Sequence, residues 1–105
     1  MTESYTFLDD ITREFTPPDE GMTTRPFFTS DRLKAVGFGF AAGAALTEHT
    51  APFPAILQIL SGEATLTLGT EQKDVSAGAW VYMTARLTHA IRAKSAVTML
   101  LLLLK

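Results

Sequence analysis

At 105 residues the chain has room for one domain and not for two, and its apolar content of 47% is enough for a packed core. The formal net charge is −2 and the nine Lys and Arg residues are scattered, which argues against nucleic acid as a partner, because phosphate binding needs clustered positive charge. Without cysteine the chain cannot form disulfides, Cys-ligated zinc sites or thiol nucleophiles.

The N-terminal segment, residues 1–21, is expected to form an arm and a loop in front of the folded domain. It ends in the sequence Thr-Pro-Pro-Asp-Glu-Gly, in which two prolines and a glycine oppose regular structure. Tyr5, Phe7 and Leu8 give the arm apolar side chains. These side chains predict that the arm packs against a surface.

The rest of the chain, residues 22–105, is expected to form one β-barrel. Short apolar segments, such as residues 22–29 and 33–40, alternate with turn signals about every ten residues, which is typical of β-sandwiches and barrels. In residues 62–69 apolar and polar side chains alternate, as in a strand with one buried face. Residues 33–40 alternate by size, with Val36, Phe38 and Phe40 on one face and Ala35, Gly37 and Gly39 on the other.

The last segment, residues 97–104, is apolar on both faces of the expected strand. Its length suits a strand that is covered on both sides, and the helix propensity of leucine makes a short terminal helix the competing interpretation. A strand of this kind left uncovered would promote aggregation. The simplest cover is a second copy of the chain, so we expect a homodimer.

Targeting signals are not expected in this sequence. The first residues include early acids and no apolar core of a secretory signal. The apolar run 97–104 is far shorter than the about 20 residues of a membrane helix. We therefore expect a cytoplasmic protein that does not contact a membrane.

Residues 37–42 match the loose G-x-G-x-x-A pattern of dinucleotide sites. That pattern requires a turn from strand to helix, where the helix N-terminus meets the pyrophosphate. Gly37 and Gly39 instead fall inside an alternating strand, and no helical period follows them. We expect these glycines to leave space for a close neighbour, a bulge or a cavity.

The two histidines of the chain, His49 and His89, stand in two spaced patterns. The first reads Gly-x5-His-x-Ala-x3-Ala-x6-Gly from Gly43, and the second reads Gly-x5-Thr-x-Arg-x2-His from Gly78. In this order they resemble the two motifs of the cupin superfamily, G-x5-H-x-H-x3,4-E-x6-G and G-x5-P-x-G-x2-H. The resemblance covers residues 33–105 and is to small, single-domain, RmlC-like cupins of bacterial type. It implies an all-β, double-stranded β-helix (jelly-roll) cupin barrel.

The motifs lack half of the metal ligands that the resemblance implies. Metal-binding cupins bring together two histidines and a glutamate from the first motif and a histidine from the second. Here Ala51 stands at the second histidine position and Ala55 at the glutamate position, so that His49 and His89 remain. The second motif has a threonine at its proline position and Arg86 at its glycine position, which puts its usual turn in doubt.

Two imidazoles can hold a divalent transition metal such as Zn, Ni, Fe or Mn, but tight catalytic sites generally offer three protein ligands and an open position. Strand alternation puts Glu48, Thr50 and Gln58 on the outward side, so none of them replaces a missing ligand. The sequence leaves open whether His49 and His89 bind a metal.

We predict a mostly apolar pocket for a small molecule inside the barrel. Its expected lining is His49, His89, Ala51, Ala55, Leu57 and Tyr82. Histidine can act as an acid or base near neutral pH, but no carboxylate is in place to orient either ring, so catalysis is left open.

Three functions follow from this pocket. The first is a small-molecule-binding cupin, with weak metal binding added if the histidines hold an ion. The second is a metal-dependent oxygenase or isomerase that uses His49 and His89. The third is a non-catalytic sensing or scaffolding dimer. Trp80 and Arg86 fit either the mouth of the barrel or an interface, and the sequence assigns neither.

Overall fold

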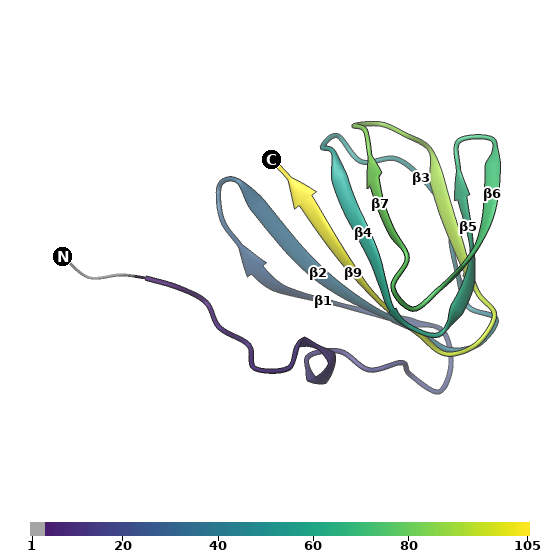
Figure 1. Ribbon diagram of the computed structural model, residues 1–105, viewed down its shortest axis with the longest axis horizontal. Coiled ribbons are helices and arrows are strands. Elements are labelled where there is room, and N and C mark those ends of the chain that lie inside the picture. Colours follow the sequence, from purple (N-terminus) through teal and green to yellow (C-terminus); the bar gives the residue numbers. More distant parts are fainter. Residues whose placement is uncertain (1–3) are drawn as a thin grey trace.

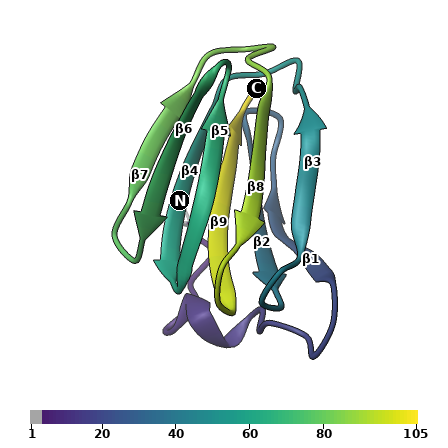
Figure 2. The same cartoon turned by 90° about the vertical axis from the view of Figure 1, so that its right-hand side faces the viewer.

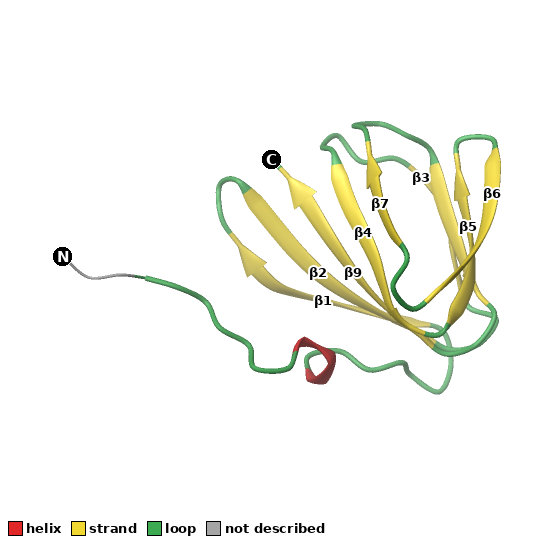
Figure 3. Cartoon of the chain, viewed as in Figure 1, coloured by secondary structure: helices red, strands yellow, loops and turns green. Residues whose placement is uncertain are grey.

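The computed structural model describes residues 4–105, which form strands and one short 3-10 turn (Figures 1 and 3). The first three residues of the expected arm lie outside the described residues. No helix in the described part of the chain is long and apolar enough to cross a membrane. In chain order the elements are η1 (Ile11–Arg13), β1 (Met22–Thr29), β2 (Leu33–Phe40), β3 (Ala45–His49), β4 (Ala55–Ser61), β5 (Glu63–Leu68), β6 (Glu71–Ser76), β7 (Trp80–Met83), β8 (His89–Ala93) and β9 (Val97–Leu104).

The strands form two antiparallel sheets that face each other (Figure 2). Sheet A has five strands in the order β1-β2-β9-β4-β7, and sheet B has four in the order β3-β8-β5-β6. Strands that follow each other in the chain often lie in opposite sheets, as β3 and β4 do. This is the jelly-roll arrangement, and it confirms the predicted all-β fold.

The core lies between the two sheets, and alternation along each strand decides which side chains enter it. In β2 the large residues predicted to face the core do so, and Phe40 is fully buried. Burying a side chain of this size stabilises the fold by about 1.5–3 kcal/mol. The buried cluster comprises Val36, Phe38, Phe40, Ala55, Leu57, Ile59, Ala64, Leu66, Met83, Ile91, Ala93, Val97 and Met99.

Strand β9 runs through the middle of sheet A, between β2 and β4. The prediction of a strand is confirmed, and the helix alternative is wrong. Val97 and Met99 lie in the core, and Leu101 and Leu103 pack against it. The even-numbered leucines from residue 100 to 104 take the opposite face by alternation, where each is only partly buried.

The arm crosses the outer face of sheet A over β2. Phe15 is 5% exposed and stacks on Phe27, with ring centroids 6.2 Å apart. A side chain at Gly37 would collide with the Phe15 ring, and one at Gly39 would collide with the carbonyl of Thr16. The two glycines therefore leave space for the arm, which is the close neighbour expected from the sequence.

The first described residues of the arm run away from the barrel (Figure 1). Tyr5 is 85% exposed and Phe7 is 73% exposed. The expectation that these two side chains pack against a surface is therefore wrong within a single chain, and Phe15 is the anchor instead. Leu8 lines a hollow of about 380 Å3 between the arm and sheet A, together with Phe28 and other apolar residues.

Candidate functional site

The structure brings His49 and His89 together. His49 is the last residue of β3, His89 is the first residue of β8, and the register of the two strands pairs them directly. Their ring centroids are 4.1 Å apart and their planes make an angle of 59°. Strand β3 ends and β8 begins at the same end of the barrel, which we call the mouth (Figure 2).

A β-bulge in β3 turns His49 toward His89. Leu46 pairs with Ile91 and His49 pairs with His89, so that β3 advances three residues while β8 advances two. Leu46 packs against the core, and in a regular strand a residue three positions later would point outward. The extra residue restores the inward direction of His49, and re-aiming a side chain is a common role of bulges near functional sites.

Each imidazole is held by a backbone carbonyl two residues earlier in the chain. His49 Nδ1 lies 3.0 Å from the carbonyl oxygen of Thr47, and His89 Nδ1 lies 2.9 Å from that of Leu87. A carbonyl oxygen only accepts hydrogen bonds, so each Nδ1 is the donor and each neutral ring has an unprotonated Nε2. This arrangement fixes the tautomer of both rings and leaves two acceptor atoms for a ligand.

His89 is the more deeply placed ring of the pair, with only 7% of the residue exposed. Burial lowers the pKa of His89 below its ordinary value, because it disfavours the charged form. The hydrogen bond to the Leu87 carbonyl raises this pKa, and the charge of a protonated His49 lowers it further. His89 is therefore neutral at pH 7, with its Nε2 lone pair available.

Of the two alanines at the missing ligand positions, Ala51 lies in the loop between β3 and β4, and Ala55 is the first residue of β4. Ala51 is partly buried, and its carbonyl accepts a hydrogen bond of 2.8 Å from the backbone N–H of Arg86. Ala55 is 3% exposed in the core, where β4 pairs it with Met83 and Leu103. The backbone of the first-motif segment is thus bonded into the barrel, although two of its side chains differ from those of the metal-binding motif.

The two remaining predicted pocket residues lie on opposite faces of sheet A. Leu57 is buried in the core and lines a hollow of about 160 Å3, which Trp80, residues of β6 and Leu68, the β5 partner of His89, also line. Tyr82 lies between Val81 and Met83, which face the core, so its own side chain points outward and is 49% exposed. The expectation that Tyr82 lines the interior is therefore wrong, because alternation in β7 turns it away.

The loop of the second motif keeps its turn in spite of the substitution at its glycine position. Arg86 has a φ of 67°, in the left-handed region, and among the described residues it is the one non-glycine with a positive φ. A side chain in this region costs about 1–2 kcal/mol per residue. The sequence put the turn of the second motif in doubt, but the structure has this turn, with backbone strain at Arg86.

The donor set does not fit the full metal centre that the resemblance implies. Within residues 4–105 no group of three or more His, Cys, Asp or Glu side chains could hold a metal ion. The two imidazoles have the right tautomers, but rings sharing one tetrahedral ion have centroids roughly 5 Å apart, given N–Zn bonds of about 2.0–2.1 Å. His49 and His89 are closer than that and would have to separate.

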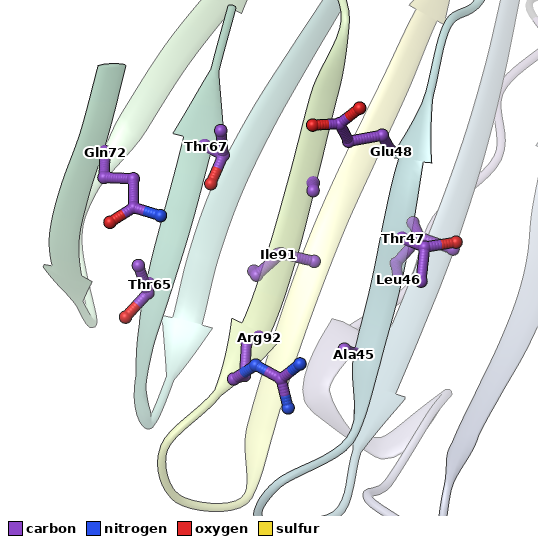
Figure 4. Close-up of a pocket in the computed structure, with 10 residues that line it drawn as sticks. Ala45, Leu46, Thr47, Glu48, Thr65, Thr67, Gln72, Ile91 and Arg92 are labelled. Atoms are coloured by element: carbon purple, nitrogen blue, oxygen red, sulfur yellow. The ribbon is translucent and has the colours of Figure 1, made fainter. Parts of the chain in front are cut away.

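A third hollow, of about 400 Å3, lies on the outer face of sheet B (Figure 4). Ala45 and Ala90 line it with small side chains, and Glu48 and Arg92 lie toward opposite ends of it. Neither histidine lines any of the three hollows, which lie on the outer face of sheet B, beside the arm and at Leu57. The candidate site is therefore the histidine pair itself and the loops around it.

Sequence reasoning missed the backbone groups that orient the pair. These are the carbonyls of Thr47 and Leu87 and the bulge before His49. One signal was present, because Thr47 and Glu48 are consecutive polar residues where a half-buried strand should alternate. The side chains before His89 give no sign in the sequence that the Leu87 carbonyl would orient its ring.

Comparisons with known proteins agree with this geometry. A family model described as a cupin domain matches residues 38–104. A conserved protein of unknown function from Streptococcus pyogenes is 30% identical, with a TM-score of 0.82 over 98% of this chain and 90% of that one. A cupin superfamily protein from Desulfitobacterium hafniense is 24% identical, with a TM-score of 0.83 over 90% of this chain and 86% of that one.

An RmlC-like cupin from Shewanella frigidimarina shares the fold at 15% identity, with a TM-score of 0.80 over 98% of this chain and 91% of that one. No curated protein sequence matches the chain. The family model covers more than half of the chain and includes both histidines. The chain therefore belongs to the cupin family.

Proposed function

We propose that this cupin domain binds a small organic molecule at the mouth of its barrel, through the Nε2 atoms of His49 and His89. The observation that carries the proposal is the pair of hydrogen bonds from Nδ1 to backbone carbonyls. They leave Nε2 as an acceptor on each of two rings whose centroids lie 4.1 Å apart, and no described residue donates to either Nε2 atom. A ligand hydroxyl or ammonium group would supply the missing donor.

The substitutions in the first motif support binding of an organic ligand more than tight binding of a metal. Alanine at positions 51 and 55 means that two side chains that could donate to a metal are absent from the first motif. His49 is only partly buried, so solvent and ligand can reach the pair. A metal-dependent oxygenase or isomerase needs a third protein ligand, which the described residues do not provide. A weakly held ion remains an outcome to be tested.

The test compares His89→Asn with His89→Gln in titrations with glycerol, lactamide and lactate, followed by NMR of the imidazole nitrogens. Asparagine keeps a donor near the position of Nδ1 and removes the acceptor at Nε2, while glutamine does the reverse. We expect His89→Asn to fold normally and to lose binding at least tenfold. We expect His89→Gln to be less stable and to keep part of the binding.

Two results would overturn the proposal. One is unchanged binding of all three probes by His89→Asn and by His49→Asn. The other is loss of binding when the wild-type protein is treated with EDTA and its recovery with Zn or Ni, which would show that a metal ion is the binding group.

We further propose that two copies of the chain associate through the outer face of sheet A. On strands β7, β4 and β9 this face carries Trp80, Tyr82, Ile56, Gln58, Leu100, Leu102 and Leu104, by the register of the three strands. None of these residues is charged, and Trp80 is 59% exposed. A contiguous apolar face of this kind marks an interface.

A second copy fits this face because the chain also supplies a free apolar segment. Tyr5 and Phe7 are exposed in the arm, whose first described residues run away from the barrel (Figure 1). In a two-fold pair each copy would pack this segment, as well as its sheet A face, against the other. A standard interface covers about 800 Å2 on each partner, roughly an eighth of the 6530 Å2 surface of this chain. The area required is therefore modest.

Light scattering after size-exclusion chromatography tests the dimer at micromolar concentration. We expect the wild-type chain to be a dimer and Leu102→Glu to be a monomer. Thr67→Glu is the matched control, since it places the same charge on the outer face of sheet B and should leave the dimer intact. A monomeric wild-type chain, or a Leu102→Glu variant that stays dimeric, would contradict this assembly.

A further inference from the structure

Arg86 occupies a backbone position that the fold would fill with glycine. Its φ of 67° places it in the left-handed region, where every other described residue with a positive φ is a glycine. Glycine adopts this conformation without the steric cost that a side chain incurs. Residues held in such conformations concentrate at functional sites, so the side chain at this position calls for an explanation.

The fold does not use the guanidinium group of Arg86. Its side chain is exposed, and it forms no hydrogen bond or ion pair with any residue from 4 to 105. Only its backbone takes part in the structure, through the N–H that donates to the Ala51 carbonyl at 2.8 Å. Glycine would make the same backbone bond without strain.

The backbone of Arg86 lies between the two motif segments at the mouth. Its hydrogen bond to Ala51 joins it to the residue two positions after His49. The next residue, Leu87, supplies the carbonyl that orients His89. Arg86 is therefore linked through short backbone segments to both rings of the pair.

The loops around the histidine pair carry no other charge. They are residues 50–54, 69–70 and 84–88, and the Gly69 N–H joins the last two by donating to the Thr88 carbonyl at 2.8 Å. Glu48 precedes His49 but lines the hollow on the outer face of sheet B. The mouth thus combines two imidazole acceptors with the Arg86 guanidinium, and Glu71 at the start of β6 and Lys105 after β9 are the charged residues that flank these loops.

We propose that the ligand of this site is a small hydroxycarboxylate and that Arg86 is the residue that recognises its carboxylate. A guanidinium group matches a carboxylate with two parallel hydrogen bonds. The hydroxyl of the same molecule donates to an imidazole Nε2. This inference rests on the proposed function, since it names the ligand class for the same pair of histidines.

The test uses acid and amide pairs that differ only in charge, lactate with lactamide and glycolate with glycolamide. Their affinities for the wild-type chain are measured by NMR titration at low ionic strength. We expect each acid to bind at least tenfold more tightly than its amide. We expect Arg86→Gln and Arg86→Gly to abolish this preference, and Arg86→Lys to keep part of it.

Arg92→Gln is the matched control, because it removes a positive charge from the outer face of sheet B, away from the mouth. It should leave the preference for the acid unchanged. Equal affinity of acid and amide for the wild-type chain, or an undiminished preference in Arg86→Gln, would overturn the role of Arg86. If the amides bind in a way that depends on His89 but not on Arg86, the binding site stands and only this inference fails. Absence of binding by all four compounds would overturn both.

Discussion

The two motif segments of this barrel have diverged in opposite ways. In the first segment, around β3 and β4, the backbone still aims His49 inward through a bulge, while Ala51 and Ala55 have replaced the donor side chains. In the second, the histidine is kept, while Arg86 replaces a glycine and strains the turn. The first change removes metal-binding side chains and leaves the backbone path in place. The second costs stability and introduces a charge at the mouth.

The most demanding test of the first segment is to restore its donors with Ala51→His and Ala55→Glu together. Ala55 lies in the core, so a glutamate there should destabilise the metal-free protein, because a buried charge without a partner is costly. With Ni or Zn added, the four donors should bind the metal at least about 100-fold more tightly than the wild-type chain does. A free metal concentration of 100 times Kd would then raise the free energy of unfolding by about 2.7 kcal/mol. Calorimetric titration and thermal unfolding with and without EDTA measure both effects.

A control for this restoration is Ala51→His with Ile56→Glu. Position 56 is next to Ala55 in β4 but faces outward, so its carboxylate cannot reach the histidines. The single variant Ala51→His keeps the test informative if the glutamate prevents folding, and it should bind with intermediate affinity. If Ala51→His alone and Ala51→His with Ala55→Glu both bind metal no more tightly than the wild-type chain, the first segment no longer holds the metal-site geometry.

Much of this structure was predictable because alternation and turn residues act locally. The face of β2 that holds Phe38 and the strand at residues 97–104 follow from strand period. The meeting of His49 with His89 was expected from the resemblance to the cupin motifs. The direction of Tyr82 was also available, because Met83 next to it is a core residue, and the expectation failed by ignoring that alternation.

Other features depend on contacts that a single sequence does not encode locally. Gly37 shows that something approaches β2, but only the folded chain shows that Phe15 is the neighbour, since the two are far apart in sequence. The exposure of Tyr5 and Phe7 likewise depends on what surrounds the arm. The left-handed turn at Arg86 runs against residue preference, so only the surrounding barrel determines it.

The second segment is tested by Arg86→Gly, which should stabilise the protein. Removing the side chain relieves the left-handed strain, while the greater freedom of glycine in the unfolded chain offsets part of the gain. We expect a net increase of about 1 kcal/mol in the free energy of unfolding, or about 4–8 °C in Tm. Ala85→Gly in the same loop is the control, and it should destabilise, because Ala85 has no positive φ to relieve. A decrease in stability for Arg86→Gly would show that the guanidinium group supports the fold.

The smallest expected effect is on the pH dependence of the free energy of unfolding, to which His89 and His49 should contribute differently. Burial lowers the pKa of His89 in the folded chain, so below the ordinary value of about 6.5 the unfolded chain binds more protons than the folded one. The contribution of His89 to stability is therefore complete above pH 6.5 and is lost as the pH falls through that value and on to the lower folded pKa. Urea unfolding between pH 8 and pH 5 should show this decline, and His89→Asn should reduce its slope. His49→Asn should reduce it less, since it removes only the repulsion from a charged neighbour. Asp10 and Asp74, whose pKa values are lowered by hydrogen bonds from Thr12 and Lys94, titrate below this range and do not contribute to the slope. An unchanged slope in His89→Asn would mean that the buried half of the pair does not control the pH response of the site.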